Sequence, residues 1–430
     1  MQLLATLLNA WKIKDIRRKL LFTLAMLLVY RLGSFVPVPG IDSSIVQEIL
    51  KGQGGEGGGL FGLFDMFAGG ALSQFSVFAM GIMPYINATI IMQLLQVVIP
   101  KFEEWSKEGP EGRKKLMQVS RYGTVVLGLI QSIGMSFAFS QAIEVDRVVD
   151  PTGYYTTLVI IALSLTAGTA FLMWLGEQIT EKGIGNGISI IIFSGIVSRV
   201  PQGAVQLFSL WRAGELNVFN LFAIAVLGLA VIAAVVFITQ GERRVPVQYA
   251  KRVIGRRMYG GASTHIPLKV NQAGVIPVIF ATSLLLFPQT IAQFWDNAIV
   301  QMIADFFTIG TLPGTIFTVL LIVFFSYFYT AITVNPVDLA DNMRKNGGFI
   351  PGIRPGRSTA NHIQHILNRI TLAGAVFLGA VVALPYILTG VIGLQVGIGG
   401  TALLIVVGVA LETMKQIESQ MLMRHYKGFM

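Results

Sequence analysis

Ten long apolar runs recur along the chain and are separated by polar segments. Each run holds roughly 15 to 25 residues, and an α-helix needs about 20 residues to cross a hydrocarbon core about 30 Å thick. The pattern therefore predicts an all-α membrane protein with ten transmembrane helices. The expected spans lie at about 20–37, 75–99, 119–141, 154–176, 188–208, 217–239, 273–292, 315–334, 370–388 and 400–414.

Five of these spans fall in each half of the chain. Because five is odd, the second half enters the membrane from the side opposite to the first, so two inverted five-helix halves are geometrically allowed. Transport proteins built in this way place their pathway where the two repeats meet. No clear sequence identity links the halves here, and the prediction of inverted halves rests on the span count.

A shorter apolar segment lies between the first two spans. It follows the tract GQGGEGGG at residues 52–59 and extends from 60 to about 72. Three or four helical turns are too short to cross a bilayer, so the segment is either a re-entrant helix covered by protein or an amphipathic surface helix. Its large apolar residues are Leu60, Phe61, Leu63, Phe64, Met66 and Phe67.

Lysine and arginine are unevenly divided between the segments that separate the spans. With the N-terminus inside, the inner segments hold 27 of the 32 basic residues. Basic loops stay on the cytoplasmic side, so both termini are expected in the cytoplasm. The net charge of +10 is therefore interpreted first as a sign of membrane orientation and only second as a sign of nucleic acid binding. The four outer residues are Lys51, Arg147, Arg199 and Arg212, and Arg31 lies near the outer end of the first span.

Groups for catalysis or ion coupling are scarce in the predicted spans. An ionisable side chain at mid-bilayer costs at least about 2.5 kcal/mol and normally serves a function, and essentially none is present. The chain has no cysteine, and its four histidines all fall in cytoplasmic segments. We therefore predict no catalytic residue, no metal site and no cofactor. Three functional classes remain: a passive pore, an ion-coupled secondary transporter and a membrane enzyme. For the enzyme, the sequence offers no candidate catalytic group.

Two cytoplasmic loops are longer and more basic than membrane topology requires. In the second loop, Pro351 and Pro355 bracket Arg354, and their fixed φ angles hold the guanidinium outward. The loops are read either as a docking surface for an acidic or phosphate-rich partner or as a contact for lipid headgroups. The first loop, 241–272, contains Arg243, Arg244, Arg256 and Arg257, and the second, 335–369, contains Arg354 and Arg357.

Five motifs, in order along nearly the whole chain, resemble those of the SecY family. They are GIMPYINATIIMQLL at 81–95, FLMWLGEQITEKGIGNGISIIIFSGI at 171–196, YAKRVIGRRMYGGASTHIPLKVNQAGVIPVIFA at 249–281, NPVDLADNMRKNGGFIPGIRPG at 335–356 and GGTALLIVVGVALETMKQIESQ at 399–420. The resemblance implies a protein-conducting channel with two hinged five-span halves, an hourglass pore, a plug helix and a lateral gate open to lipid.

The resemblance also implies roles for individual residues. The plug corresponds to about 60–72, and the lateral gate lies between the second and seventh spans. The pore ring corresponds to Ile82, Ile86, Ile188, Ile192, Ile279 and Ile405. The polar gate candidates follow from position and not from an exact motif, and they are Asn87, Gln93, Gln131, Thr282 and Ser283.

Partners and layout follow from the same resemblance. The channel is expected to be passive, to be driven by the motor ATPase SecA or by the ribosome, and to bind small SecE and SecG subunits, preprotein signal sequences and the lipid of a bacterial plasma membrane. Arg354 and the pair Arg256 and Arg257 are the strongest docking candidates. The expected parts are a cytoplasmic amphipathic segment at 1–19, an N-terminal half at 20–210, a C-terminal half at 211–414 and a cytoplasmic tail at 415–430.

Overall fold

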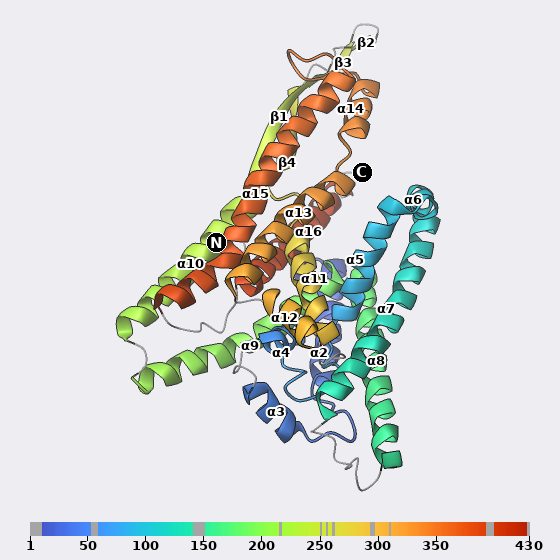
Figure 1. Ribbon diagram of the computed structural model, residues 1–430. Coiled ribbons are helices and arrows are strands. Elements are labelled where there is room, and N and C mark those ends of the chain that lie inside the picture. The colour runs from blue at the N-terminus through green and yellow to red at the C-terminus, as the bar shows by residue number, and fades with distance from the viewer. Residues whose placement is uncertain are drawn as a thin grey trace.

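The computed structural model describes residues 11–52, 59–140, 151–214, 217–249, 252–254, 257–259, 263–292, 297–308, 311–392 and 400–427. Every one of the ten predicted spans overlaps a long helix, and Figure 1 shows these helices. These helices are α2 (Lys14–Gly33), α5 (Met83–Val98), α7 (Pro110–Ala138), α8 (Pro151–Lys182), α9 (Gly187–Arg212), α10 (Val218–Gln240), α11 (Ile276–Ala292), α13 (Leu312–Thr333), α15 (Arg357–Ile392) and α16 (Gly400–Lys427).

Length and hydropathy alone identify fewer membrane spans than the fold contains. Among the described residues, six helices pass both criteria, namely α8, α9, α10, α13, α15 and α16. A seventh span results if α5 is joined to α6 (Pro100–Lys107), which turns away from it by 100°. The helices α2 and α7 begin with charged turns, and α11 is short. Only part of α2 and of α7 is therefore strongly apolar, whereas α11 is apolar along its length but has only 17 residues.

Helix contacts repeat between the two halves of the chain. In the first half α5 packs on α7, α7 on α8, α8 on α9 and α2 on α9; in the second half α11 packs on α13, α13 on α15, α15 on α16 and α10 on α16. Counted along the spans, these are the same four pairings in each half. The protein is therefore an all-α membrane protein of two five-helix halves, inverted because each half holds an odd number of spans.

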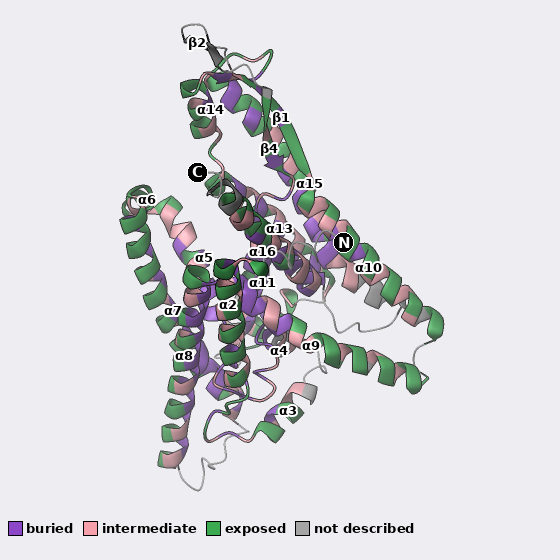
Figure 2. Ribbon diagram, turned by 180° about the vertical axis from the view of Figure 1, so that it is seen from behind, coloured by how far each residue is buried: buried purple, intermediate pink, exposed green. Residues whose placement is uncertain are grey.

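Two seams join the halves. On one side α5 contacts α11, and on the other α9 contacts both α10 and α16. A large apolar cluster runs across both seams and contains buried residues from each half. The buried residues gather at the centre of Figure 2, whereas the outward faces of the long helices are exposed. The faces include large apolar side chains such as Phe222, Leu229 and Phe237 on α10, as expected of helices that meet lipid.

The second span begins later than the sequence suggests. Residues 75–82 form turns, and α5 starts only at Met83. Gly81 has φ of 57°, a left-handed conformation that interrupts a right-handed helix, and Pro84 then occupies the first turn, where its missing N–H is not needed. The predicted span at 75–99 is therefore wrong over its first eight residues.

Three short helices complete the membrane region: α3 (Ser43–Gly52), α4 (Gly59–Phe67) and α12 (Ala298–Phe306). The carboxylate of Asp42 accepts hydrogen bonds from the amide and the hydroxyl of Ser44, at 2.8 and 2.7 Å. These bonds stabilise the charged form, and so they lower the pKa of Asp42. Asp42 thereby caps the start of α3.

The basic loop at 241–272 forms a long hairpin, which the sequence reading did not foresee. Strand β1 (Glu242–Tyr249) pairs antiparallel with β4 (Ser263–Lys269), and β5 (Gly348–Phe349) adds to the other edge of β1. Val245 and Val247 are buried while the residues between and before them are exposed, so one face of β1 packs inward. Beyond β1, the strands β2 (Arg252–Ile254) and β3 (Arg257–Tyr259) form a two-stranded sheet.

The hairpin and the second basic loop form one structural unit. A second apolar cluster joins Val247 and Leu268 of the hairpin to Met343 of α14 (Pro336–Lys345) and to Ile363 and Leu367 of α15. We call this unit, residues 242–249, 263–269 and 336–367, the hairpin extension. Figure 1 shows it projecting beyond the bundle of long helices.

Candidate functional site

The six isoleucines predicted to line a pore lie on the helices that form the two seams. Ile82 and Ile86 lie at the start of α5, Ile188 and Ile192 lie one turn apart on α9, Ile279 lies on α11 and Ile405 on α16. All except Ile188 are at most 6% exposed and belong to the large apolar cluster, and half-buried Ile188 packs against it. The fold thus gathers side chains from four distant segments into one apolar region. Their arrangement as a ring stays a prediction.

Helix α4 corresponds to the predicted plug. Phe64 and Phe67 belong to the same apolar cluster as five of the six isoleucines, and Met66 packs against it. The nine-residue helix contacts α9. The side chains of Leu60, Phe61 and Leu63 lie outside the described residues. Of the two alternatives that the sequence left open, α4 follows the re-entrant one, because its described apolar side chains face the protein interior.

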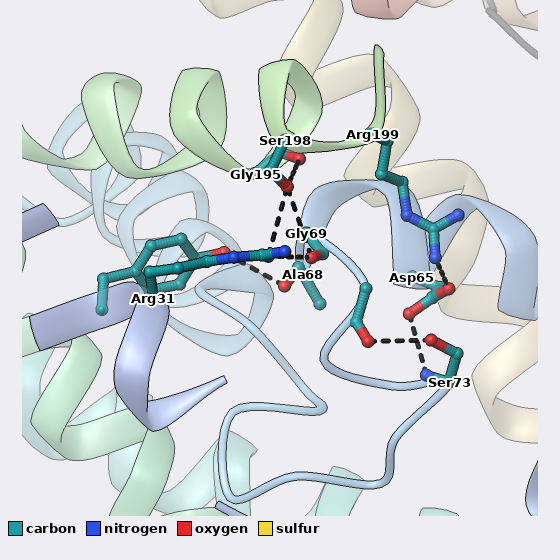
Figure 3. A network of polar contacts seen from close by, with 10 residues as sticks. Arg31, Asp65, Ala68, Gly69, Ser73, Gly195, Ser198 and Arg199 are labelled. Carbon is teal, nitrogen blue, oxygen red and sulfur yellow. Dashed lines mark hydrogen bonds and ion pairs between the residues drawn. The ribbon is translucent and has the colours of Figure 1, made fainter. Parts of the chain in front are cut away.

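A polar cluster, which the sequence reading missed, surrounds the turn after α4. Figure 3 labels four of its side chains, which are Arg31, Asp65, Ser198 and Arg199. The fifth is Tyr30, the residue before Arg31 on α2. Asp65 of α4 forms an ion pair with Arg199 of α9. Tyr30 Oη and Arg31 Nη1 of α2 donate to the carbonyls of Ala68 and Gly69, at 3.0 and 2.9 Å. Three separate elements therefore meet at one short turn.

Arg199 corrects two expectations from the sequence. It was counted with the outer loops, yet it lies inside α9, and it falls within a predicted span that was expected to lack fixed charge. The cost of a charge there is offset because Asp65, only 5% exposed, lies against it. A single acidic residue in the otherwise apolar segment 60–68 is the sequence signal that could have pointed to this pair.

The predicted gate residues lie along the α5–α11 seam or next to it. Ser283 of α11 is buried and its hydroxyl approaches the sulfur of Met83 on α5, at 3.8 Å, so it bridges the seam. Thr282 instead donates to backbone carbonyls of its own helix. The amide oxygens of Gln93 and Gln131 are buried without a hydrogen-bond partner, and Asn87 is half-buried. Two unsatisfied amides destabilise the packed arrangement beside this seam.

The predicted docking arginines are distributed over the hairpin extension and the strands beyond it. Arg243 and Arg244 are exposed on β1, and Arg354 and Arg357 are exposed at the loop that leads into α15. The hydroxyl of Thr359 donates to the carbonyl of Arg354 at 3.0 Å and fixes the backbone at the tip. Arg257 lies on β3, with its side chain undescribed, and Arg256 lies outside the described residues.

No metal centre is found in the part of the chain that the structure describes. Within it, no three His, Asp or Glu side chains come close enough to hold an ion.

Two inverted five-helix halves, an apolar centre at their seams and a short helix packed into that centre define an integral membrane protein of the channel class. The SecY family profile matches residues 76–414, and the chain belongs to the SecY family. It is 51% identical over 434 residues to "Protein translocase subunit SecY" of Halalkalibacterium halodurans, with 99% of each chain covered.

Solved structures of protein channels share the fold. A SecY structure described as having a plug domain that stabilises the closed state and maintains a membrane seal matches with a TM-score of 0.66, at 18% identity, over 94% of this chain and 92% of the other. Sec61 from a canine ribosome–channel complex of the endoplasmic reticulum matches with a TM-score of 0.60 over the same shares of both chains, also at 18% identity.

Proposed function

We propose that this chain is the central pore subunit of a protein-conducting channel. In this function, unfolded secretory proteins cross the plasma membrane through it, and transmembrane segments leave it sideways into the lipid. The observation that carries the proposal is the apolar cluster at the seams, which contains five of the six candidate ring isoleucines and the described aromatic side chains of α4. The name of the relative and the channel structures of the same fold support it.

The pore ring works through its apolar chemistry. A narrow constriction of branched apolar side chains wets poorly, so it resists ions in the absence of cargo. Because apolar contacts are not directional, the same side chains can rearrange around any passing polypeptide. In the resting state α4 fills the path next to the ring, and cargo displaces it.

The lateral gate lies at the α5–α11 seam, and the α9–α10 and α9–α16 contacts form the hinge opposite to it. The gate candidates Gln93 and Gln131 support this assignment, since their unpaired amide oxygens weaken the closed packing. A sufficiently apolar signal helix that enters the seam exchanges protein contacts for lipid.

The hairpin extension supplies the docking surface for SecA or the ribosome. Its exposed arginines offer guanidinium groups that pair with carboxylates or phosphates. The match to a channel from a ribosome complex supports the ribosome as a partner. SecE and SecG as membrane subunits, preprotein signal sequences as ligands, and a bacterial plasma membrane with both termini in the cytoplasm complete the proposal.

Reconstitution tests the function. The chain with SecE, SecG and SecA in proteoliposomes is expected to take up a signal-bearing preprotein when ATP is supplied, and to reject the same preprotein without its signal. Uptake of a small solute by the chain alone, driven by an ion gradient and without preprotein transport, would show a secondary transporter instead.

A charge reversal in the same assay tests the docking surface. Arg354→Glu is expected to lower SecA-dependent uptake several-fold and to weaken SecA binding, because a cation at the fixed tip becomes an anion. Lys114→Glu, at an exposed position on α7 outside the hairpin extension, serves as the matched control. Normal SecA affinity and uptake with Arg354→Glu would remove Arg354 from the docking surface.

A further inference from the structure

Asp65 is a buried carboxylate on a helix that otherwise presents apolar side chains. It is 5% exposed, whereas its neighbours Phe64 and Phe67 pack into the apolar cluster. A buried carboxylate is costly unless it is paired. Its two oxygens have separate partners: one forms the ion pair with Arg199, and the other accepts from the backbone N–H of Ser73 at 2.9 Å.

These two contacts hold the turn that follows α4 and connect it to α9. The bond from Ser73 closes the turn between residues 65 and 73, and the hydroxyl of Ser73 adds a bond to the carbonyl of Gly70 at 2.8 Å. The ion pair then ties this closed turn to α9. Figure 3 shows both contacts converging on Asp65.

A second set of contacts holds the same turn from α2. Arg31 Nη1 donates to the carbonyl of Gly69 at 2.9 Å, and Tyr30 Oη donates to the carbonyl of Ala68 at 3.0 Å. Ser198 of α9 donates to the carbonyl of Gly195 at 2.8 Å and lies 3.5 Å from that of Gly69. The turn is therefore held by directional bonds on two sides.

Backbone packing brings the turn close to α9. A Cβ added at Gly69 would lie 2.8 Å from the Cα of Gly195, so the two glycines meet without side chains between them. Gly69 also has φ of 66°, which favours glycine. A side chain at either position would push the turn away from α9, and with it Asp65 and the Gly69 carbonyl that the arginines bind.

The charged groups of this site are not fully enclosed by protein. Arg31, Ser34, Ser73 and Ser198 line a polar depression next to the turn, and the side chain of Arg199 remains 26% exposed. When the turn moves away, Arg199 and Arg31 can exchange their protein partners for water. A buried ion pair gains little over two hydrated charges, so it fixes a position without making release prohibitively costly.

We propose that Asp65, Arg199 and Arg31 are positioning residues that hold α4 in the resting path and thereby set how strong a signal sequence must be to open the channel. This inference rests on the proposed channel function. Removing Arg199 releases α4 more readily than removing Asp65 does, because the first leaves a carboxylate buried without its cation, while the second leaves a cation that can reach water.

The test uses the full chain reconstituted with its membrane partners. Because the chain has no cysteine, Ala68→Cys introduces a single thiol at a position that is 1% exposed. The rate at which a membrane-impermeant maleimide labels this thiol, at rest, reports release of α4. Uptake of a preprotein without its signal and the thermal midpoint of unfolding are measured in parallel.

The expected order of variants follows from the charges. Arg199→Gln is expected to speed labelling at least about tenfold, since breaking a buried pair from one side is strongly destabilising, and Asp65→Asn is expected to speed it less. The double variant should resemble Asp65→Asn alone, which independent effects would not give. Arg199→Lys keeps the cation and should restore slow labelling. Arg212→Gln removes an exposed cation from the same helix and serves as the control.

Two results would overturn the proposal. One is labelling at the wild-type rate in Arg199→Gln; the other is equally fast labelling in Arg199→Gln and Arg199→Lys with a lowered thermal midpoint in both, which would indicate a general loss of packing. The proposed channel function is judged separately, since it fails if the unaltered chain shows no signal-dependent uptake, whatever the labelling rates are.

Discussion

Helix α4 is held by two surfaces of opposite chemistry. On one side Phe64 and Phe67 pack into the apolar cluster that contains the candidate ring isoleucines. On the other side Asp65 and the carbonyls of Ala68 and Gly69 bind the polar cluster on α2 and α9. The first surface holds α4 through buried apolar area, which requires no fixed geometry. The second surface holds it through hydrogen bonds and an ion pair between defined donors and acceptors.

The two surfaces therefore have different roles: the apolar surface seals the path, and the polar surface fixes the resting position of α4. Apolar contacts depend on buried area and tolerate rearrangement, so the ring side can seal around α4 or around cargo. Hydrogen bonds, including the charge-assisted ones here, weaken steeply when distance or angle changes. The polar side therefore specifies one resting position. Substitutions on the apolar side should therefore change resting ion conductance, and substitutions on the polar side should change the rate at which α4 is released.

The largest effect is expected from a polar side chain in the apolar cluster. Ile192→Asn places an amide at a position that is 0% exposed and removes packing volume, at a cost of about 3 to 5 kcal/mol. We expect a higher resting ion conductance in planar bilayers and a lower thermal midpoint. Ile192→Leu conserves the volume and should cost less than about 1.5 kcal/mol. Equal conductance in both variants would exclude Ile192 from the constriction.

The next largest effect tests the close approach on the polar side. Gly69→Ala forces a side chain into a left-handed backbone position and brings its Cβ to 2.8 Å from Gly195, at a cost of about 2 to 4 kcal/mol. The expected result is faster thiol labelling at Ala68→Cys. Gly70→Ala is the matched control, since its φ is 89° but its nearest neighbouring atom lies 3.7 Å away. If Gly70→Ala labels as fast, backbone strain and not the close approach is responsible.

A smaller effect is expected from a single hydrogen bond of the polar cluster. Tyr30→Phe removes the donor to the Ala68 carbonyl and keeps the ring that stacks on Phe78 at 6.2 Å, so it should cost about 1 kcal/mol. A labelling rate increased roughly fivefold, with unchanged resting conductance of the closed channel, would agree with a role in placement. An unchanged rate would remove Tyr30 from the contacts that hold the turn.

The smallest effect is expected from a conservative change on the ring side. Ile405→Val removes one methylene at a position that is 0% exposed and should cost about 0.5 to 1.5 kcal/mol. Resting conductance and the signal requirement are both expected to stay as in the unaltered chain, because the constriction remains apolar and branched. A loss of the signal requirement would mean that the ring side also specifies position.

The lengths of the apolar runs predicted the number and order of the long helices but not where each begins. The run at 75–99 is apolar throughout, yet helix starts only at Met83, because Gly81 takes a left-handed conformation. The hairpin at 242–269 was missed for a related reason. Its alternation is confined to Val245 and Val247, and the side chains that cover them include residues of α14 and α15, far along the chain.

Some residues of the candidate site were likewise predicted from the sequence, and others were not. The isoleucines were named because their motifs resemble a family, and the fold places five of them in one buried cluster with the sixth packed on it. Arg199 was misplaced because a lone arginine in an apolar stretch reads as a loop residue. Asp65, 134 residues earlier in the chain, supplies the carboxylate that pairs with this charge inside α9.

By itself, the sequence predicted a membrane protein of ten apolar runs in two sets of five, because the transfer of apolar residues out of water depends mainly on local composition. The tertiary structure decided which helices form the two seams, that α4 lies inside the protein, and that Arg199 meets Asp65. Those outcomes depend on contacts between residues far apart in the chain, and no local pattern specifies which distant partner a side chain will have.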